Sequence, residues 1–366
     1  MDTIRVSEAI GIKPDELKGS LKEGEIQELS YGGLNYLRLR EKVGDAESGT
    51  AIFLNPFKPI PAFPKIRRAI ILEATLRKHF SSFAIEEKLD GYNIRIARVG
   101  KELVGISRGG LVCPYSTSLL RNKPEIAKFL VENDTTLCCE LVGEESPYVS
   151  HDYPESHKLD YFIFDIIRDG NSIPIRERQE LCTKFGLNQV RNLGDFDGPA
   201  MEKIWEILHM LQSEDREGIV IKSHDMKTQM KYTLSNANIA EINFAFQFPF
   251  DSGIEFFFRR FIREAFQSYE LGESDTELRK RAQELGLSIL QPLRDSIGKV
   301  SGGEKLTYDS EIEGDQETLK GFVEHLEGLG IKFEHEFHGN KLMIKRMHQA
   351  SHDKIRNYLG GEFASD

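Results

Sequence analysis

The sequence predicts an α+β fold whose core is built from antiparallel sheets and helices. Between residues 83 and 234, short segments alternate apolar and polar residues, a pattern typical of strands, with helix-like stretches between them. Residues 244–297 are predicted to be helical instead and carry many phenylalanines. The chain has 366 residues, which is too long for one ordinary core, so two to four domains are expected.

The amino-terminal 64 residues are expected to form a module of their own. Residues 31–39 end in strand-like alternation, and the proline-rich stretch 55–64 is typical of a connector. We therefore place a domain boundary at this stretch. Residues 65–80 carry isoleucine, alanine and leucine near helical spacing, which predicts an amphipathic helix.

The next segments place Lys88 at the end of a strand. Residues 83–87 and 93–99 have strand patterns, and Asp90-Gly91 between them is a turn signal, so a hairpin is expected. A lysine in that position can act as a nucleophile if its amine is neutral, which requires a pKa lowered by burial or by a nearby cation. An ordinary hairpin with a solvated lysine explains the same pattern when it is taken alone.

Three later segments each carry a candidate side chain. A glycine-rich turn presents Arg108, either as a donor fork for a ligand or as a surface arginine. Glu140 lies in an apolar strand, where a carboxylate is costly unless it is paired, binds something or faces water. Phe164 lies in a second apolar strand and either offers its ring to a base or is part of the core.

Residues 215–223 carry two further charged candidates. Regular strand geometry would put Glu217 and Lys222 on opposite faces, unless the strand bulges or begins only after Gly218. Another short strand follows at residues 230–234 and contains Lys231. Both lysines are equally compatible with solvated surface positions.

Taken in order, these segments resemble the motifs of the covalent nucleotidyltransferases, the superfamily of ATP-dependent ligases and capping enzymes. The matching stretches are Lys88-Leu89-Asp90-Gly91, Ser107-Arg108-Gly109-Gly110, Glu140-Leu141-Val142-Gly143, Phe164-Asp165-Ile166, Glu217-Gly218-Ile219-Val220-Ile221-Lys222 and Met230-Lys231-Tyr232. Asn93, which follows the lysine motif, and the helical region after residue 237 are most similar to the homodimeric RNA ligases typical of archaea.

That resemblance implies four domains and an activity. The domains are an amino-terminal module (1–64), an ATP-grasp-like nucleotidyltransferase domain (65–236), a helical dimerisation domain (237–300) and a small α/β carboxy-terminal domain (301–366). The implied activity is ATP-dependent joining or circularisation of RNA that has 5′-phosphate and 3′-hydroxyl ends. It proceeds through AMP linked to Lys88 and then through an adenylylated RNA end.

The resemblance also implies roles for the candidate residues. The other catalytic lysines are Lys222 and Lys231 on the α-phosphate; relatives often carry a second lysine two residues before the latter, where this chain has Gln229, and a role for Lys227 stays open. The implied ligands of Mg²⁺ or Mn²⁺ are Glu140, Glu217 and Asp165. The implied contacts to ATP or the RNA end are Glu87, Asn93, Arg108, Glu140, Phe164 and Val220.

Net charge and composition limit which partners and which cellular compartment are expected. The net charge of −11 excludes a global basic field, so RNA must meet a local basic surface, such as the lysines and arginines after residue 340, unless those are simply solvated. The aromatic block 244–261 is expected to be a homodimer interface or an internal core. Unpatterned cysteines, no apolar run that could span a membrane and no signal-like segment favour a cytoplasmic protein.

Three alternatives remain open at this stage. They are a ligase for nicked DNA, a capping-type guanylyltransferase, and an RNA-end-binding protein that keeps the fold without the chemistry. The sequence does not reveal the natural RNA, whether ends are joined within or between molecules, or whether single-stranded DNA is accepted.

Overall fold

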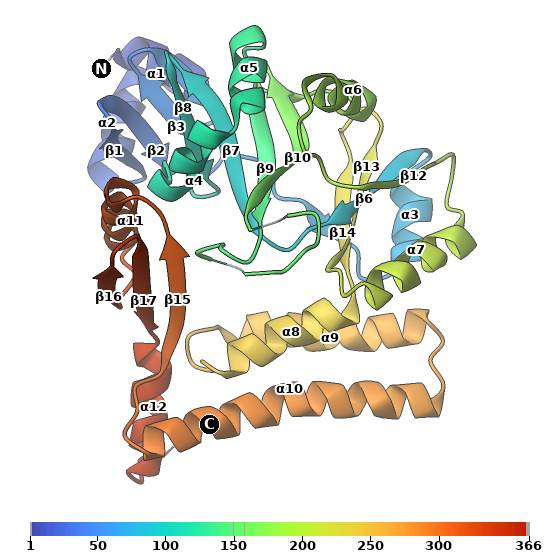
Figure 1. Ribbon diagram of the computed structural model, residues 1–366. Helices are drawn as coiled ribbons and strands as arrows, with labels where there is room; N and C mark the ends of the chain where they lie inside the picture. Colours follow the sequence, from blue (N-terminus) through green and yellow to red (C-terminus); the bar gives the residue numbers. More distant parts are fainter. Residues whose placement is uncertain (1, 149, 157, 364–366) are drawn as a thin grey trace.

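The computed structural model describes residues 2–363 except 149 and 157, and these residues form four sheets with helices around them (Figure 1). The predicted α+β class with antiparallel sheets is confirmed. Among the described residues, every helix is too short or too polar to cross a membrane.

The amino-terminal region consists of two helices and an antiparallel sheet in the order β1-β2-β3-β4. Its elements are α1 (Thr3–Ile10), α2 (Pro14–Glu23), β1 (Ile26–Tyr31), β2 (Leu34–Leu39), β3 (Ala51–Leu54) and β4 (Phe57–Ile60). The expectation that residues 55–64 are a plain connector is wrong, because β4 lies within them and pairs with β3. Phe53 and Ile60 share an apolar core with Val104 and Ile106 of the next region.

Two five-stranded sheets form the centre of the molecule, in the orders β11-β10-β9-β7-β8 and β12-β6-β13-β14-β5. The strands of the first are β7 (Tyr92–Val99), β8 (Glu102–Ser107), β9 (Thr136–Val142), β10 (Asp160–Arg168) and β11 (Asn171–Ser172). Those of the second are β5 (Arg67–Arg68), β6 (Phe83–Lys88), β12 (Asn192–Phe196), β13 (Gly218–Ser223) and β14 (Gln229–Thr233).

Lys88 ends β6 as predicted, but the expected hairpin with the following strand does not form. The chain leaves one sheet at Lys88 and enters the other at Tyr92, so β6 and β7 are not neighbours. The crossover brings Gly91 against the backbone of β9, where a Cβ atom would lie 2.4 Å from the Leu141 carbonyl oxygen. Glycine is therefore needed for this close approach rather than for a tight hairpin turn.

Helices cover the outer faces of both sheets. They are α3 (Leu72–His79), α4 (Pro114–Leu119), the 3₁₀ turn Leu120–Asn122, α5 (Pro124–Glu132), α6 (Ile175–Phe185) and α7 (Met201–Ser213). The predicted helix 65–80 is shorter than expected, because Arg67 and Arg68 pair with β14 as a short parallel strand before α3 begins. Leu72 and Leu76 of α3 then pack with Ile204 of α7 in one apolar core.

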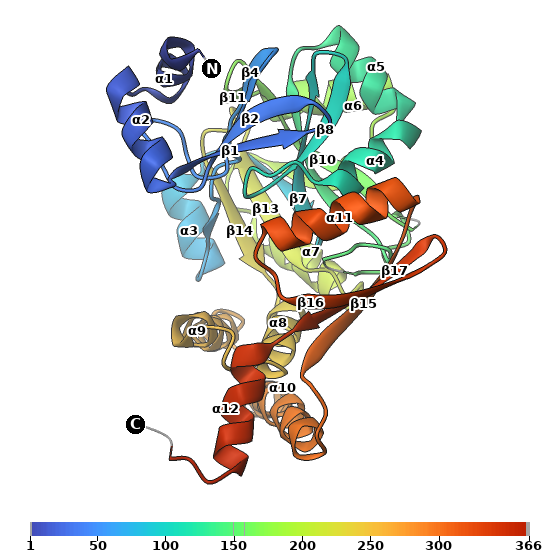
Figure 2. The same cartoon turned by 90° about the vertical axis from the view of Figure 1, so that its left-hand side faces the viewer.

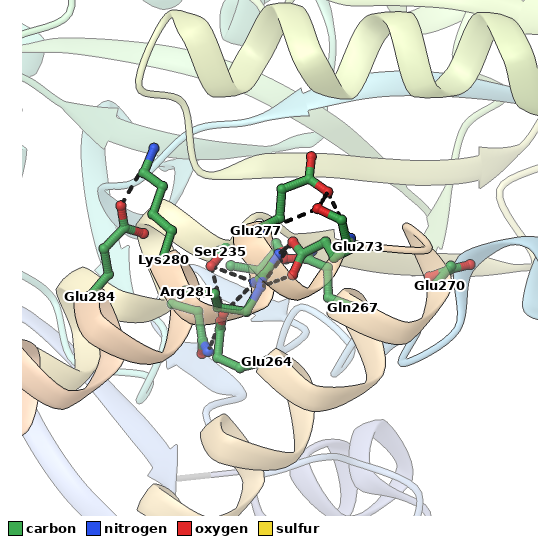
Figure 3. Close-up of polar contacts among 12 residues, drawn as sticks. Ser235, Glu264, Gln267, Glu270, Glu273, Glu277, Lys280, Arg281 and Glu284 are labelled. Carbon is green, nitrogen blue, oxygen red and sulfur yellow. Dashed lines mark hydrogen bonds and ion pairs between the residues drawn. The ribbon is translucent and has the colours of Figure 1, made fainter.

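Three helices follow the second sheet, as the phenylalanine-rich sequence predicts: α8 (Ser235–Phe246), α9 (Ile254–Glu270) and α10 (Asp275–Ser301). They lie together below the sheets (Figure 1). Arg281 of α10 links them through a buried polar network, donating to Glu264 at 2.5 Å, to Ser235 at 2.8 Å and to Glu273 (Figure 3). Gln267 extends the network to β14, where its amide donates to the Thr233 carbonyl.

The carboxy-terminal region is a three-stranded antiparallel sheet, in the order β15-β17-β16, with two helices. Its elements are β15 (Thr307–Glu313), α11 (Gln316–Gly328), β16 (Phe333–His338), β17 (Lys341–Met347) and α12 (Gln349–Leu359). In the turned view, α11 lies across the face of the central region beside α4 (Figure 2), and Phe322 packs against Tyr115 there. The expected limits of the four domains stay a prediction.

Candidate active site

A cleft of about 580 Å³ opens between the two central sheets, and α11 also contributes to its wall. This volume lies within the range of small-molecule sites. The cleft brings together nearly all of the candidate residues: Glu87, Lys88, Asn93, Arg108, Glu140, Phe164, Glu217, Val220, Lys222 and Lys231. They come from seven different segments spread over almost 150 residues of sequence.

Asp165 is the exception. Phe164 lines the cleft and Asp165 does not, and the register between β10 and β9 shifts at this point. Its fully buried carboxylate accepts hydrogen bonds from the Ser172 hydroxyl and from the backbone of Ile166 at 2.8 Å. The expectation that Asp165 binds a metal is therefore not supported by its position.

The ammonium group of Lys88 forms an ion pair with the carboxylate of Glu217, whose side chain is 6% exposed. Glu217 reaches Lys88 because it precedes β13, which begins at Gly218 itself, one residue earlier than the predicted start after Gly218. The backbone of Gly218 has φ +150°, and a Cβ atom there would lie 2.2 Å from the Tyr232 carbonyl oxygen. Glycine at this position thus allows the acid before the strand and Lys222 within it to reach the same cleft.

The charge state of Lys88 differs from the expectation of a neutral amine. Burial pulls the pKa of Lys88 down, but the Glu217 and Glu140 carboxylates outweigh burial, so this pKa lies above its usual value. The expected lowering of the Lys88 pKa is therefore wrong for the ligand-free protein. A reaction at this amine requires that Glu217 first be neutralised or drawn away.

Glu140 provides the second carboxylate near Lys88. Burial raises its pKa to about 7, and the neighbouring charges of Lys88 and Glu217 act in opposite directions on it. The described residues contain no group of three or more histidine, cysteine or acidic side chains arranged to hold a metal. Two carboxylates fit a Mg²⁺ ion that takes its remaining oxygens from phosphate and water, which is the usual arrangement at nucleotide sites.

Lys222 is held by a fully buried charge network. Its Nζ atom lies 2.7 Å from Glu86 and donates to the Phe164 carbonyl at 2.6 Å. Glu86 also pairs with Arg178, whose side chain is completely inaccessible. One carboxylate between two cations fixes Lys222 in position, and the buried carboxylate of Asp165 also interacts with the charges of Lys222 and Arg178.

Lys231 stands near a further cation. Burial, together with the charges of Arg68 and Lys88, lowers the pKa of Lys231 to about 8. Such a pKa is typical of an amine in a cation-rich pocket that lacks its anion. A phosphate oxygen placed there would be met by both Lys231 and Arg68.

An apolar part of the cleft can hold a flat ring. Phe164 and Val220 both line the cleft, and Phe63 packs edge-on against Phe164 with ring centroids 4.9 Å apart. Beside them, the buried Oδ1 atom of Asn93 has no hydrogen-bond partner among the described residues. A lone acceptor of this kind next to an apolar slot suits a ligand that brings its own donor.

Several residues of the cleft were missed by the sequence analysis: Phe63, Arg68, Glu86, Tyr148, His325 and Leu329. Glu86 had a signal, because it shares strand parity with Lys88 and therefore points to the same side. His325 had no such signal, because it reaches the cleft from α11, more than 200 residues after Lys88 in the sequence. Burial lowers the pKa of His325 to about 4, so the imidazole is neutral at physiological pH.

Comparison with known proteins agrees with this geometry. A family model described as RNA ligase matches residues 81–233, and one described as Ligase Pab1020 C-terminal region matches residues 244–362. A protein of Methanocaldococcus jannaschii, described as uncharacterized protein MJ0414, is 33% identical over 98% of this chain and 96% of its own length.

Solved structures extend the match over the whole chain. A structure titled archaeal ATP-dependent RNA ligase, form 1, is 36% identical and covers 100% of both chains with a TM-score of 0.95. A putative ATP-dependent DNA ligase from Aquifex aeolicus is 28% identical and covers 96% of this chain and 100% of its own, with a TM-score of 0.87. The fold is that of an ATP-dependent ligase. The chain belongs to the archaeal ATP-dependent RNA ligase family, as its motifs predict.

Proposed function

We propose that this protein is an ATP-dependent RNA ligase that seals 5′-phosphate to 3′-hydroxyl ends through AMP carried on Lys88. The observation that supports this most directly is the position of Lys88. Lys88 is the last residue of β6 and lines the cleft, which also contains the carboxylates of Glu140 and Glu217 and two further lysines. This set of groups suits nucleotidyl transfer, in which negative charge collects on phosphate oxygens.

In the proposed first step, the Lys88 amine attacks the α-phosphorus of ATP and pyrophosphate leaves. Lys222 and Lys231 neutralise the charge that gathers on the α-phosphate. Phe164 and Val220 hold the adenine between them, with Glu87 near its edge, while Asn93 and Arg108 contact the phosphate or the RNA end. In the following steps the 5′-phosphate of the RNA takes the AMP, and the 3′-hydroxyl displaces it.

Glu140 and Glu217 would hold a Mg²⁺ or Mn²⁺ ion. The ion would neutralise phosphate charge. By engaging Glu217 it would also remove the partner that keeps Lys88 protonated, so the amine could lose its proton to solvent. Glu217 thus changes from a partner of Lys88 in the free protein to a metal ligand in the loaded one.

The test is label transfer from α-labelled ATP to the protein. We expect the wild type to take up one AMP and Lys88→Ala to take up none, while Lys227→Ala, which alters an exposed lysine paired with Asp225, retains the label. Supplying RNA or single-stranded DNA with matched ends then separates the two ligase substrates. GTP in place of ATP tests the capping alternative. Label retained by Lys88→Ala would remove Lys88 from the proposed role.

We also propose that two copies of the chain associate through the helical region. Large apolar side chains are exposed there, including Ile254 (88%), Phe258 (60%), Leu287 (52%) and Leu290 (68%). Monomeric proteins rarely leave such a set uncovered. Sedimentation velocity should give twice the monomer mass, and Phe258→Glu with Leu290→Glu should give the monomer. A wild-type monomer at micromolar concentration would contradict this.

A further inference from the structure

Three arginines meet where the central sheets join the helical region: Arg68 of β5, and Arg260 and Arg263 of α9. We call these three residues the arginine seam. Glu241 of α8 lies among them, and a single oxygen, Oε2, is 2.7 Å from Nη2 of Arg260 and 3.4 Å from Nη2 of Arg263. The side chains of Arg260 and Arg263 are only 15% and 11% exposed.

The seam has more positive charge than its partners neutralise. Arg68 donates to the Thr233 hydroxyl, a neutral group, and Arg260 donates to the Phe256 carbonyl at 3.1 Å. Nε of Arg260 and Nη1 of Arg263 are buried and have no hydrogen-bond partner among the described residues. Charged donors left in this state carry a desolvation cost that an anion would remove.

The pKa shifts of the individual arginines agree with this excess of positive charge. Burial, together with the nearby charge of Arg263, lowers the pKa of Arg68 to about 10. Burial also lowers the pKa of Arg260, while Glu241 opposes that shift. The guanidinium groups therefore repel one another across the seam, and Glu241 compensates only in part.

The seam is continuous with the active-site cleft. Arg68, Lys231 and Glu241 all line the cleft, so Glu241 stands between the cleft and the two arginines of α9. In Figure 1, α8 and α9 lie just below the lower end of β14, the strand that carries Lys231. A ligand that leaves the cleft on this side meets Glu241 first and the arginines behind it.

We propose that the arginine seam is a phosphate subsite for the RNA backbone, and that Glu241 occupies it in the free protein. This rests on the proposed RNA ligase function. A guanidinium group binds phosphate through paired donors, so backbone phosphates can replace Glu241 and satisfy the unpaired donors as well.

The distribution of other cations favours RNA as the occupant. The chain carries a net charge of −11, so a polyanion must bind where positive charge is locally uncompensated. In the basic carboxy-terminal stretch, Lys341 pairs with Glu311 at 2.5 Å and Arg356 with Asp353 at 3.2 Å, while Lys345, Arg346 and Lys354 are exposed, so their charges are already solvated and carry no desolvation cost that an anion would remove. The seam adjoins the cleft and keeps unpaired guanidinium donors.

The experiment uses the full-length protein with Arg260→Gln and Arg263→Gln combined. Single-turnover sealing of pre-adenylylated RNA needs no ATP and therefore measures how well the protein binds and seals RNA. AMP transfer from ATP to the protein measures the reaction with the nucleotide separately. We expect the RNA concentration for half-maximal sealing to rise at least tenfold and AMP transfer to stay within twofold of the wild type. Arg259→Gln is the matched control, because Arg259 is the neighbouring arginine on α9 but is 71% exposed and pairs with Glu255.

Salt dependence adds a readout that a purely structural defect would not produce. Loss of two phosphate contacts should make the plot of the logarithm of the RNA association constant against the logarithm of the salt concentration less steep. The slope should change by about 1.4, at about 0.7 per contact for single strands. Arg260→Lys with Arg263→Lys should keep the wild-type slope because it keeps the charges. Glu241→Gln should bind RNA more tightly, about two- to fivefold, since it frees the arginines.

Four results would overturn the proposal. They are a raised KM for ATP with normal sealing of pre-adenylylated RNA, an unchanged salt slope, an unchanged half-saturating RNA concentration, and weaker RNA binding by Glu241→Gln. If the double glutamine variant does not fold, the Glu241→Gln result decides. Failure of the wild type to accept AMP would refute the proposed function instead, and the AMP-transfer assay detects that failure separately.

Discussion

The ion pair between Lys88 and Glu217 leads to a prediction about the nucleophile that can be tested without any reaction taking place. In Glu217→Gln the carboxylate charge is lost, while the burial that lowers the Lys88 pKa remains. An opposite charge in contact shifts a pKa by roughly 1–3 units. We therefore expect the pKa of Lys88 to fall below its wild-type value in this variant, because burial is then opposed only by the weaker influence of the remaining carboxylates.

The consequence for the neutral amine is large. A lysine with an ordinary pKa of about 10.4 is neutral in roughly one molecule in a thousand at pH 7.5, and Lys88 in the wild type lies below that fraction. Each unit by which the pKa falls raises the neutral fraction about tenfold at this pH. The variant should thus carry a more nucleophilic amine and still transfer AMP slowly, because the proposed metal ligand is missing.

Competitive acetylation between pH 7 and 11 measures this pKa directly. The Lys88 peptide is quantified by mass spectrometry against an internal reference amine, and the midpoint of its reactivity gives the pKa. Glu140→Gln is the graded comparison and should shift the midpoint less, because Glu140 acts on Lys88 through charge, whereas Glu217 also bonds to it. An unchanged or higher midpoint in Glu217→Gln would refute the reasoning.

Three further predictions follow from the charges described above. The pKa of Glu140, raised by burial to about 7, means that the folded protein binds more protons than the unfolded chain between pH 4.5 and 7. Stability is therefore lost as pH rises through that window, and in metal-free urea unfolding Glu140→Gln should reduce the difference between pH 5 and pH 8 by about 2 kcal/mol. Lys231, with a pKa lowered by burial to about 8, should lose its charge above that pH, so the ratio of kcat/KM for AMP transfer in the wild type to that in Lys231→Arg should fall between pH 8 and pH 9, because the titration of Lys88 affects both proteins alike. Arg281→Met should cost about 3–5 kcal/mol in urea unfolding, since it leaves the buried Glu264 without its cation, whereas the exposed Arg279→Met should cost less than about 0.5 kcal/mol.

The sequence was sufficient for elements whose signal is local. Strand alternation located β6, β9, β10, β13 and β14, and the motif residues on them do line one cleft, because a strand presents alternate side chains to one side. Strand pairing has no such signal. Asp90-Gly91 has the composition of a hairpin turn, yet the chain crosses between two sheets there.

Charge state is the second property that the sequence could not supply. The motif residues that predicted a cation-rich pocket around Lys88 include the acids Glu140 and Glu217. Only the distances of these acids from the Lys88 amine decide whether they raise its pKa more than burial lowers it. Arg68 and Glu86 were missed for a related reason, since their importance comes from Lys231 and Lys222, residues more than 130 positions away. Periodicity describes a single element and carries no information about which distant element lies opposite.

In the free protein, the reactive cations of the cleft are held by carboxylates of the chain itself. Glu217 holds Lys88 and Glu86 holds Lys222, while Glu241 holds the α9 arginines. The pairs of Lys88 and Lys222 are largely buried, whereas Glu241 is 33% exposed, and we expect a ligand to enter by exchanging one partner for another of the same sign. ATP brings anions for the lysines but no cation for Glu217, and we expect Glu217 to release Lys88 when a divalent cation takes the place of the amine. Saturating ATP without a divalent ion should therefore bind in the cleft and leave Lys88 unmodified, and adding the ion should start AMP transfer without a further change in ATP occupancy.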